Sequence, residues 1–264
     1  MMALRSINLS FWVACWLALF SCAAHAEAPV TGSKPFKVLC AIPENHESYR
    51  PIRYVYRQAL EQLGYELEWQ VVSPARAFHN ITHDNGDAVC LTTPLTLKLL
   101  DTGVGDMLNT VVGSSAIYGW SIRDDIIINR QLLQPNTQLR IGYLKNFTGD
   151  FFLKSLGITQ GIAIKDVSMA AKMMISGRLD AMILIETESF EKTLSYWLER
   201  QQIDSSKQLH HNIVSDIHYV PYLHQRHEHL RPALEQALQK LIEPQGGPIS
   251  RKTIAQWLEV SSSN

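Results

Sequence analysis

Residues 139–186 constrain the fold of this chain more than any other stretch. Short β-rich runs alternate there with helical segments, which predicts a strand–helix–strand–helix–strand unit. Strands that alternate with helices at this spacing pair in parallel through right-handed crossovers. A polar turn over residues 146–150 stands where the first strand meets its helix. Because open parallel sheets take small molecules at the carboxyl ends of their strands, we expect this unit to form half of a ligand-binding cleft.

A second set of strand and helix signals precedes this unit. Apolar residues recur at helical spacing over 49–63, and Gly64 ends that pattern. The remaining signals predict further elements, namely strands at 36–42, 67–72 and 87–91 and helices at 75–83 and 95–100. We expect these strands and helices to form the other half of the cleft.

The chain is therefore expected to fold as an α/β protein with two lobes, each a mostly parallel sheet flanked by helices. Extended segments at 117–129 and 210–223 are suited to cross between the lobes. Helices at 230–241 and 249–258, separated by Gly246-Gly247-Pro248, return the chain to the first lobe. The expected division is lobe 1 over 34–118 plus 219–264 and lobe 2 over 119–218.

The N-terminus predicts export. Arg5 precedes an apolar run over 11–23, and Ala24-His25-Ala26 offers small residues where a signal peptidase cuts. We expect residues 1–26 to be a cleaved signal peptide and the mature chain to be periplasmic. The alternatives are an uncleaved anchor and lipidation at Cys22.

Composition narrows the class of partner. The net charge is −1 at pH 7, which argues against nucleic-acid binding because that role needs a basic face. The chain has no P-loop, no Gly-x-Ser-x-Gly elbow and no dinucleotide-binding fingerprint. We therefore expect a monomer without a cofactor.

Several segments resemble one family of proteins. The segment Ser168–Ile185 contains Gly177-Arg178-Leu179-Asp180-Ala181 after a helix, and residues 141–145, 73–77 and 86–89 match the same pattern. In these segments the chain is similar to the extracellular solute-binding proteins of the amino-acid transporter type (family 3). The resemblance covers most of the mature chain, and it implies the type II periplasmic binding protein fold with a small-molecule ligand.

The ligand positions depart from the pattern of this family. Members that bind amino acids carry an arginine a few residues after the third strand, but residues 92–98 contain none. Those members also place an aspartate shortly after the Gly-Arg-Leu-Asp-Ala segment, and Glu186 takes that position in this chain only if the register shifts by one residue. The resemblance thus implies an amino-acid-like compound, an amine or an organic acid, without choosing among them.

Four candidates for contacts with the ligand lie in the first lobe. Tyr49 either stacks on the ligand or packs at the hinge, and Arg76 either supplies a cation or is a solvated surface residue. Thr92 and Thr93 follow a strand and offer hydroxyl groups. Thr93 precedes a proline, so it is also suited to cap a helix.

Five more candidates lie at the crossover and in the second lobe. Ser115 and Tyr118 either line the cleft floor or belong to an ordinary loop. Thr148 and Asp150 precede a helix, where Asp150 also complements the helix dipole. Glu186 ends the last strand of the unit.

The histidines suggest a metal site only at first sight. His79 and His83 stand four residues apart on a predicted helix, and three more histidines follow at 224, 227 and 229. A bound metal needs three or four converging ligands, and further side chains that hydrogen-bond to those ligands and orient them. The sequence has no tight motif of that kind, so we expect no metal.

Two cysteines of the mature chain leave two readings open. Cys40 and Cys90 fall near the ends of the first and third predicted strands, which are neighbours in the usual strand order of the family. They form either a disulfide, as an oxidising compartment allows, or two buried thiols.

The leading functional hypothesis is a periplasmic solute-binding protein, not an enzyme, that closes two lobes around a small polar ligand. It delivers that ligand to an inner-membrane permease or presents it to a sensor. The alternative is a dehydratase-like periplasmic enzyme on the same fold, with Glu186 or Asp150 as its acid–base group. A third reading is a domain that binds a partner protein instead of a solute.

Overall fold

The structure is a computed structural model that describes residues 33–94, 96–97, 103–128, 138–145, 153, 156–158, 160–185, 188–204 and 209–262. Residues 35–264 form one compact unit. The predicted signal peptide and Cys22 lie outside the described residues. Among the helices of the described ranges, none has the length and apolar character that a membrane crossing needs.

The elements alternate as the sequence pattern predicts. They follow in the order β1 (Lys34–Cys40), α2 (Tyr49–Gln62), β2 (Tyr65–Val71), α3 (Pro74–Thr82), β3 (Ala88–Thr92), β4 (Gly105–Met107), β5 (Gly113–Ser121), β6 (Ile141–Leu144), β7 (Ile162–Ile164), α6 (Val167–Ile175), β8 (Ala181–Leu184), α7 (Glu188–Arg200), β9 (His210–His224), the 3-10 helix η1 (Gln225–Leu230), α9 (Arg231–Ile242), the 3-10 helix η2 (Glu243–Gln245) and α10 (Ile254–Ser262).

Local sequence explains where the helices begin and end. The hydroxyl of Ser73 accepts the backbone N–H of Arg76 and Pro74 opens α3, which is a standard helix start. The carboxylate of Asp166 accepts the backbone N–H of Met169 at the start of α6. Gly64 follows α2 in the left-handed region, with φ of 79°.

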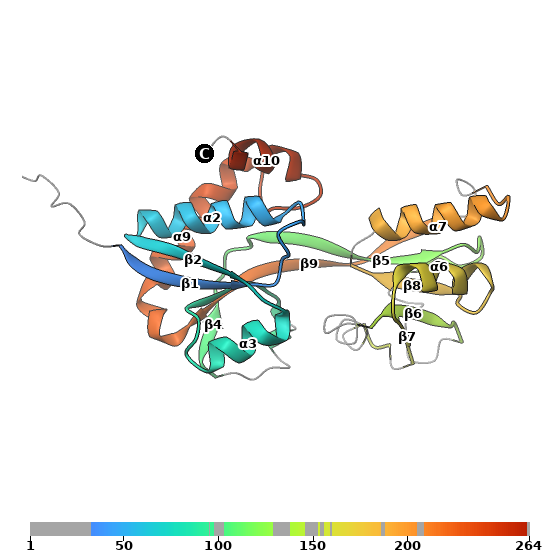
Figure 1. Cartoon of the computed structure of the whole chain (residues 1–264), viewed down its shortest axis with the longest axis horizontal. Helices are drawn as coiled ribbons and strands as arrows, with labels where there is room; N and C mark the ends of the chain where they lie inside the picture. Colours follow the sequence, from blue (N-terminus) through green and yellow to red (C-terminus); the bar gives the residue numbers. More distant parts are fainter. Residues whose placement is uncertain are drawn as a thin grey trace, which may run out of the picture. The chain divides into compact units, whose positions relative to one another are not determined.

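The described strands form a nine-stranded sheet in the order β2-β1-β3-β9-β5-β8-β6-β7, with β4 paired to β9. Parallel pairs join β1 to β3, and β6 to both β7 and β8. β9 pairs antiparallel with β3, β4 and β5, and β5 pairs antiparallel with β8. The long strands β5 and β9 thus connect the two parallel sets of strands (Figure 1).

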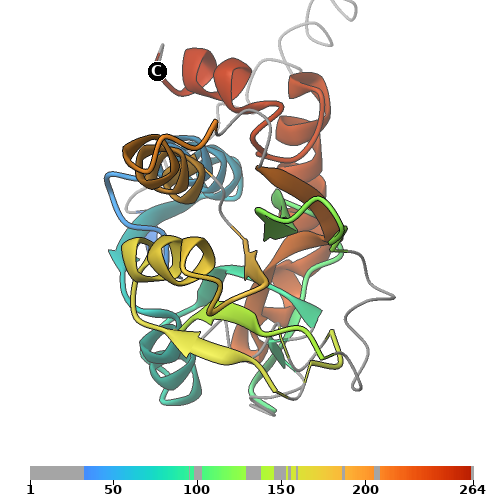
Figure 2. The same cartoon turned by 90° about the vertical axis from the view of Figure 1, so that its right-hand side faces the viewer.

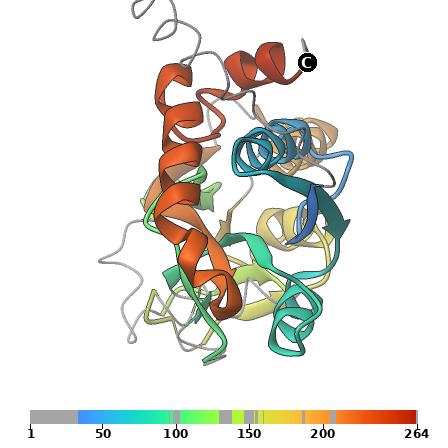
Figure 3. The same cartoon turned by 90° about the vertical axis from the view of Figure 1, so that its left-hand side faces the viewer.

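Two apolar cores cover the faces of the sheet around β1 and β3. Successive residues of a strand point to opposite faces, so Val38 and Cys40 join the core under α2, α9 and α10, whereas Leu39 joins the core under α3. Both α9 and α10 pack against α2 (Figure 3). Helices on both faces are expected for parallel strands, which are buried on both sides.

The strands β6 and β8 are also covered on both faces. Met182 and Leu184 of β8 join a core with α6 and α7, and Ile183 between them joins a core with Ile141 and Leu153. The helices α6 and α7 pack against each other (Figure 2). The α/β layering predicted from the sequence is therefore confirmed for both sets of strands.

The structure differs most from the sequence prediction at the starts of β5 and α10, and it adds the strand β4. The first crossing strand begins at Gly113, before the predicted 117, because the small polar residues there pair with β9. β4 was not predicted from its three residues. The last helix begins at Ile254 and not at 249, because Ile249 exchanges backbone hydrogen bonds with Val112 and Ser114. The predicted lobe boundaries, 118/119 and 218/219, fall inside β5 and β9.

Candidate functional site

The structure contains a pocket of about 680 Å³ at the carboxyl ends of the parallel strands. Ala41 follows β1, Thr92 ends β3, Leu144 ends β6 and Ile185 follows β8, and all four line this pocket. Segments of β5, of β9 and of the turn before α10 complete the wall. The pocket therefore lies where the topology of an open α/β sheet places a small-molecule site.

Four of the predicted ligand contacts line the pocket together. Thr92 and Thr93 come from the end of β3, and Ser115 and Tyr118 come from β5. The two threonines are buried, and Ser115 and Tyr118 are half-buried. β9 lies between β3 and β5 in the sheet, so the pocket gathers these four side chains from both sides of β9.

Two predicted contacts stand outside the lining of the pocket. Tyr49 begins α2 and its ring lies edge-on to Trp69, with 6.3 Å between ring centroids. Arg76 is exposed in the first turn of α3. Their proposed ligand contacts stay predictions that this geometry does not favour, because Tyr49 turns toward β2 and Arg76 toward solvent.

The remaining candidates are Thr148, Asp150 and Glu186, which lie outside the described residues. Their neighbours Leu144 and Ile185 do line the pocket. The role of these three side chains stays a prediction.

Sequence reasoning missed a part of the pocket that comes from distant segments. Tyr219 lies on β9, and Ser250, Arg251 and Lys252 lie in the turn between Ile249 and α10. No local pattern marks them. Only the pairing of Gly113 with both Tyr219 and Ile249 brings these residues to the site.

Thr92 and Thr93 are neighbours with different hydrogen-bonding states. The hydroxyl of Thr93 accepts the backbone N–H of Thr96 and pairs with the Thr96 hydroxyl at 2.9 Å, so it caps the turn that follows. The Thr92 hydroxyl is buried and has no partner within the described part of the chain. The register between β3 and β9 shifts between Val89 and Thr92, and such irregularities re-aim side chains near functional sites.

Tyr219 adds a neutral phenol to the pocket wall. Burial raises the pKa of the Tyr219 hydroxyl to about 12, so this group stays protonated at neutral pH. It therefore contributes a ring and a hydroxyl but no charge.

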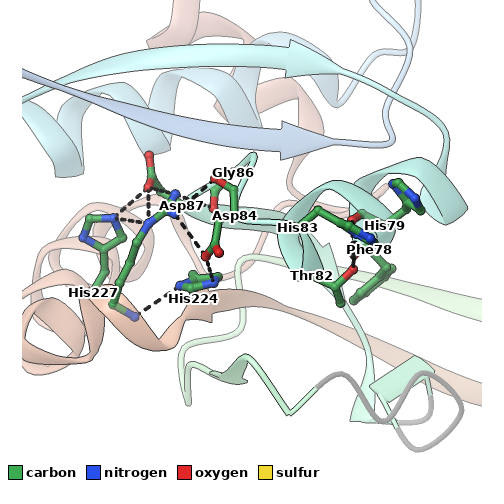
Figure 4. A network of polar contacts seen from close by, with 10 residues as sticks. Phe78, His79, Thr82, His83, Asp84, Gly86, Asp87, His224 and His227 are labelled. Carbon is green, nitrogen blue, oxygen red and sulfur yellow. Dashed lines mark hydrogen bonds and ion pairs between the residues drawn. The ribbon is translucent and has the colours of Figure 1, made fainter.

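A separate polar network lies at the opposite end of β3, around Asp87 (Figure 4). The Asp87 carboxylate accepts the backbone N–H of Lys37, the guanidinium of Arg226 and Nε2 of His227. Burial raises the pKa of Asp87, but these hydrogen bonds outweigh it and hold the pKa below its usual range. The network ties η1 to the start of β3, away from the pocket.

The histidines do not build a metal site in the described ranges. The rings of His79 and His83 stack at 4.2 Å between centroids on the surface of α3. His224 bonds to Asp84 and His227 to Asp87 (Figure 4). Within those ranges no three histidine, cysteine or acidic side chains gather as metal ligands.

Cys40 and Cys90 are joined by a disulfide, with 5.1 Å between their Cα atoms. The parallel register of β1 and β3 pairs Leu39 with Val89, so the next residues stand opposite each other. The residues that follow them, Ala41 and Leu91, both line the pocket. The disulfide thus fixes one wall of the site.

Comparison with known proteins gives structural neighbours only. No family model matches the chain, and no curated protein matches its sequence. The ligand-binding core of GluR0 in complex with L-glutamate is similar, with 12% identity and a TM-score of 0.55 over 87% of this chain and 97% of that one. The VFT2 domain of BvgS from Bordetella pertussis, a double mutant, has 12% identity and a TM-score of 0.53, over 84% and 93%. An ancestral arginine-binding protein bound to glutamine has 12% identity and a TM-score of 0.51, over 89% and 100%.

This chain has the type II periplasmic binding protein fold. The fold implied by the resemblance of Gly177–Ala181 and its neighbouring segments is therefore confirmed. In this fold two sets of parallel strands end at one site, as β1 and β3 meet β6 and β8 at the pocket.

Proposed function

We propose that this protein is a periplasmic solute-binding protein that closes around a small molecule. The observation that carries the proposal is the pocket of about 680 Å³, whose wall comes from both sets of parallel strands. A ligand in that pocket contacts both sets at once. Such a ligand stabilises the closed arrangement by its differential contacts and shifts the population toward it.

The two lobes of the proposal are residues 34–118 plus 219–264 and residues 119–218. β5 and β9 pass between them, and their pairing steps from Ile117–Ser215 to Tyr118–Ile213. That step leaves Val214 as an extra residue in β9, which is a β-bulge. We assign the hinge to this bulge, since a strand bends most readily where its ladder is interrupted.

The ligand class of the proposal is an amino-acid-like compound, an amine or an organic acid. The GluR0 core holds L-glutamate and the ancestral arginine-binding protein holds glutamine, which supports a ligand of this size. Delivery to an inner-membrane permease or presentation to a sensor, by a monomer with a cleaved signal peptide over residues 1–26, completes the proposal.

We favour binding over catalysis. The enzyme alternative assigns its acid–base group to Glu186 or Asp150, and none of the structural neighbours named above is described as an enzyme. A partner-protein domain without a solute is the third reading, but a pocket of about 680 Å³ with a buried hydroxyl suits a small molecule better.

A thermal-shift screen of amino acids, polyamines, organic acids and sugars tests the proposal. A ligand that binds the folded state alone raises the apparent stability by mass action, and about 100 times its Kd gives roughly 2.7 kcal/mol. We expect at least one class to raise Tm in a saturable way without product formation. If no class shifts Tm, solute binding is refuted; turnover of a shifted acid would favour the enzyme instead.

A further inference from the structure

The pocket wall separates apolar from charged residues. Its buried side chains include Ile52, Phe78, Ile117 and Ile183, and none of the buried lining residues in the described ranges is charged. The carboxylates and the lysine and arginine of the lining are exposed, namely Glu47, Asp216, Arg251 and Lys252; of the two lining histidines, His218 is exposed and His46 is half-buried. The charges of the pocket therefore stand at its solvent side.

This separation restricts what a ligand can bury. Moving an ionised group into an apolar wall is costly unless a countercharge or hydrogen bonds meet it there. In the described wall the ionisable side chains stand at exposed positions or, for His46, at a half-buried one, and acidic and basic groups are both present there. The buried part of a ligand must therefore be apolar, and its ionised end must face the solvent side.

Two buried threonines interrupt the apolar wall, and the hydroxyl of one of them, Thr93, is already bonded to Thr96. Thr92 is 3% exposed, and its hydroxyl lacks a partner within the described part of the chain. Leaving a buried hydroxyl without a hydrogen bond costs free energy. Rotation about χ1 exchanges the hydroxyl with the methyl group, so the hydroxyl can turn to meet a polar atom that enters the pocket.

We propose that the pocket takes a ligand with an apolar, ring-sized body, a single ionised end, and one uncharged hydrogen-bonding group that meets the Thr92 hydroxyl. This inference rests on the proposed solute-binding function and narrows its ligand class. It selects amines and organic acids with apolar bodies over amino acids with polar side chains. The pocket volume of about 680 Å³ holds a ring and a short chain, because ligand pockets of about 300–1,000 Å³ take drug-sized molecules.

Two matched pairs of compounds test this class. Tyramine and phenethylamine share an amine end, and 3-(4-hydroxyphenyl)propanoate and 3-phenylpropanoate share a carboxylate end. In each pair only the first compound carries a hydroxyl at the far end of the ring. L-arginine, L-glutamate and L-glutamine serve as compounds with polar bodies, and binding to the mature chain is measured by calorimetry and by Tm.

We expect the hydroxylated member of at least one pair to bind about tenfold more tightly than its partner. In Thr92→Val that advantage should disappear while the unhydroxylated compound keeps its affinity. Thr110→Val is the matched control, because the Thr110 hydroxyl bonds to the backbone of Glu235 away from the pocket. The control should keep the full advantage of the hydroxyl, and the Tm of each variant shows that it is folded.

Other outcomes overturn the inference in distinguishable ways. Binding of L-arginine, L-glutamate or L-glutamine without binding of the ring compounds refutes the apolar class but keeps the solute-binding function. Equal affinity within both pairs, or an advantage that survives in Thr92→Val, refutes the role of Thr92. If none of the seven compounds and no class of the wider screen binds, the function and the ligand class fail together.

Discussion

Asp180 is held by two arginines at the start of β8. The residue is 5% exposed. Its carboxylate accepts hydrogen bonds from the backbone N–H and the guanidinium of Arg140 and from the guanidinium of Arg123, with N–O distances of 2.9 to 3.0 Å. The hydrogen bond from the Arg140 side chain is the largest cause that lowers the pKa of Asp180, to about 2. The aspartate of the Gly-Arg-Leu-Asp-Ala segment therefore joins β8 to β6.

Replacing this carboxylate should weaken the fold. In Asp180→Asn we expect a loss of about 2 kcal/mol in the free energy of unfolding, because charge-assisted hydrogen bonds to a buried group are lost. Urea unfolding at pH 7 measures it. Asp125→Asn is the matched control, because Asp125 also binds Arg123 but is exposed; a loss of equal size there would contradict the assignment.

The same group predicts a pH dependence. A carboxyl whose pKa is lower in the folded state than its ordinary value near 3.9 stabilises the fold fully above that value. This contribution is lost as the pH falls from about 4 toward 2. Thermal unfolding between pH 5 and 2.5 should therefore show a shallower decline in Asp180→Asn than in the wild type, and parallel curves would refute the prediction.

Arg226 makes a second residue-scale prediction. It bonds to Asp87 and to the carbonyl of Gly86, and His227 reaches the same carboxylate (Figure 4). In Arg226→Gln, the buried Asp87 loses its main charged partner, so we expect a loss of about 2–3 kcal/mol in unfolding free energy. Ligand affinity should stay unchanged since the network lies away from the pocket, and the exposed Arg178→Gln should change neither quantity.

At the scale of single elements, the disulfide between β1 and β3 closes a loop with a sequence separation of 50 residues. Chain-entropy arguments give such a cross-link about 4 kcal/mol of stabilisation through the unfolded state. The double variant Cys40→Ala, Cys90→Ala should lose stability of this order. Dithiothreitol should lower the unfolding midpoint of the wild type but leave that of the double variant in place; equal sensitivity would refute the prediction.

The elements also show what sequence patterns can and cannot predict. The sequence pattern predicts α2 and α3 to within one residue at each end, because the apolar faces that define these helices are local. The start of α10 was missed, because Ile249 continues as backbone paired with β5. β4 was missed because its three residues become a strand only through pairing with β9.

The residues of the pocket also fall into those that the sequence predicts and those that it does not. Thr92 and Thr93 were predicted because they follow a strand, and Ser115 and Tyr118 because they approach the crossover between the lobes; all four line the pocket. Tyr219 reaches the pocket through the antiparallel pairing of β9 with β5, and Lys252 follows Ile249, which forms a parallel bridge with Gly113. The spacing of residues along the chain does not predict which distant strands pair, so these two residues could not be assigned to the pocket from the sequence.

At the scale of the whole molecule, the central prediction is that the two proposed lobes close around a bound ligand. The pocket wall comes from both proposed lobes, and β5 and β9 connect them among the strands that the structure describes, so a bound compound should reduce the radius of gyration. Small-angle scattering with each compound that raises Tm measures this. A compound that raises Tm without a change in scattering would argue for binding to a rigid pocket and against the hinge at Val214.

The shared strand β9 has a consequence for how the protein is made. One edge of β3 pairs with β9, so Val89 cannot form its strand pair until Tyr222 has been synthesised. During synthesis, β1, β2 and β3 therefore leave the ribosome long before the strand that completes their sheet exists. Distant pairings of this kind slow folding. Under the proposed export, in which the chain crosses a membrane unfolded, this delay is an advantage, because the strand order postpones the native sheet until β9 has been translated.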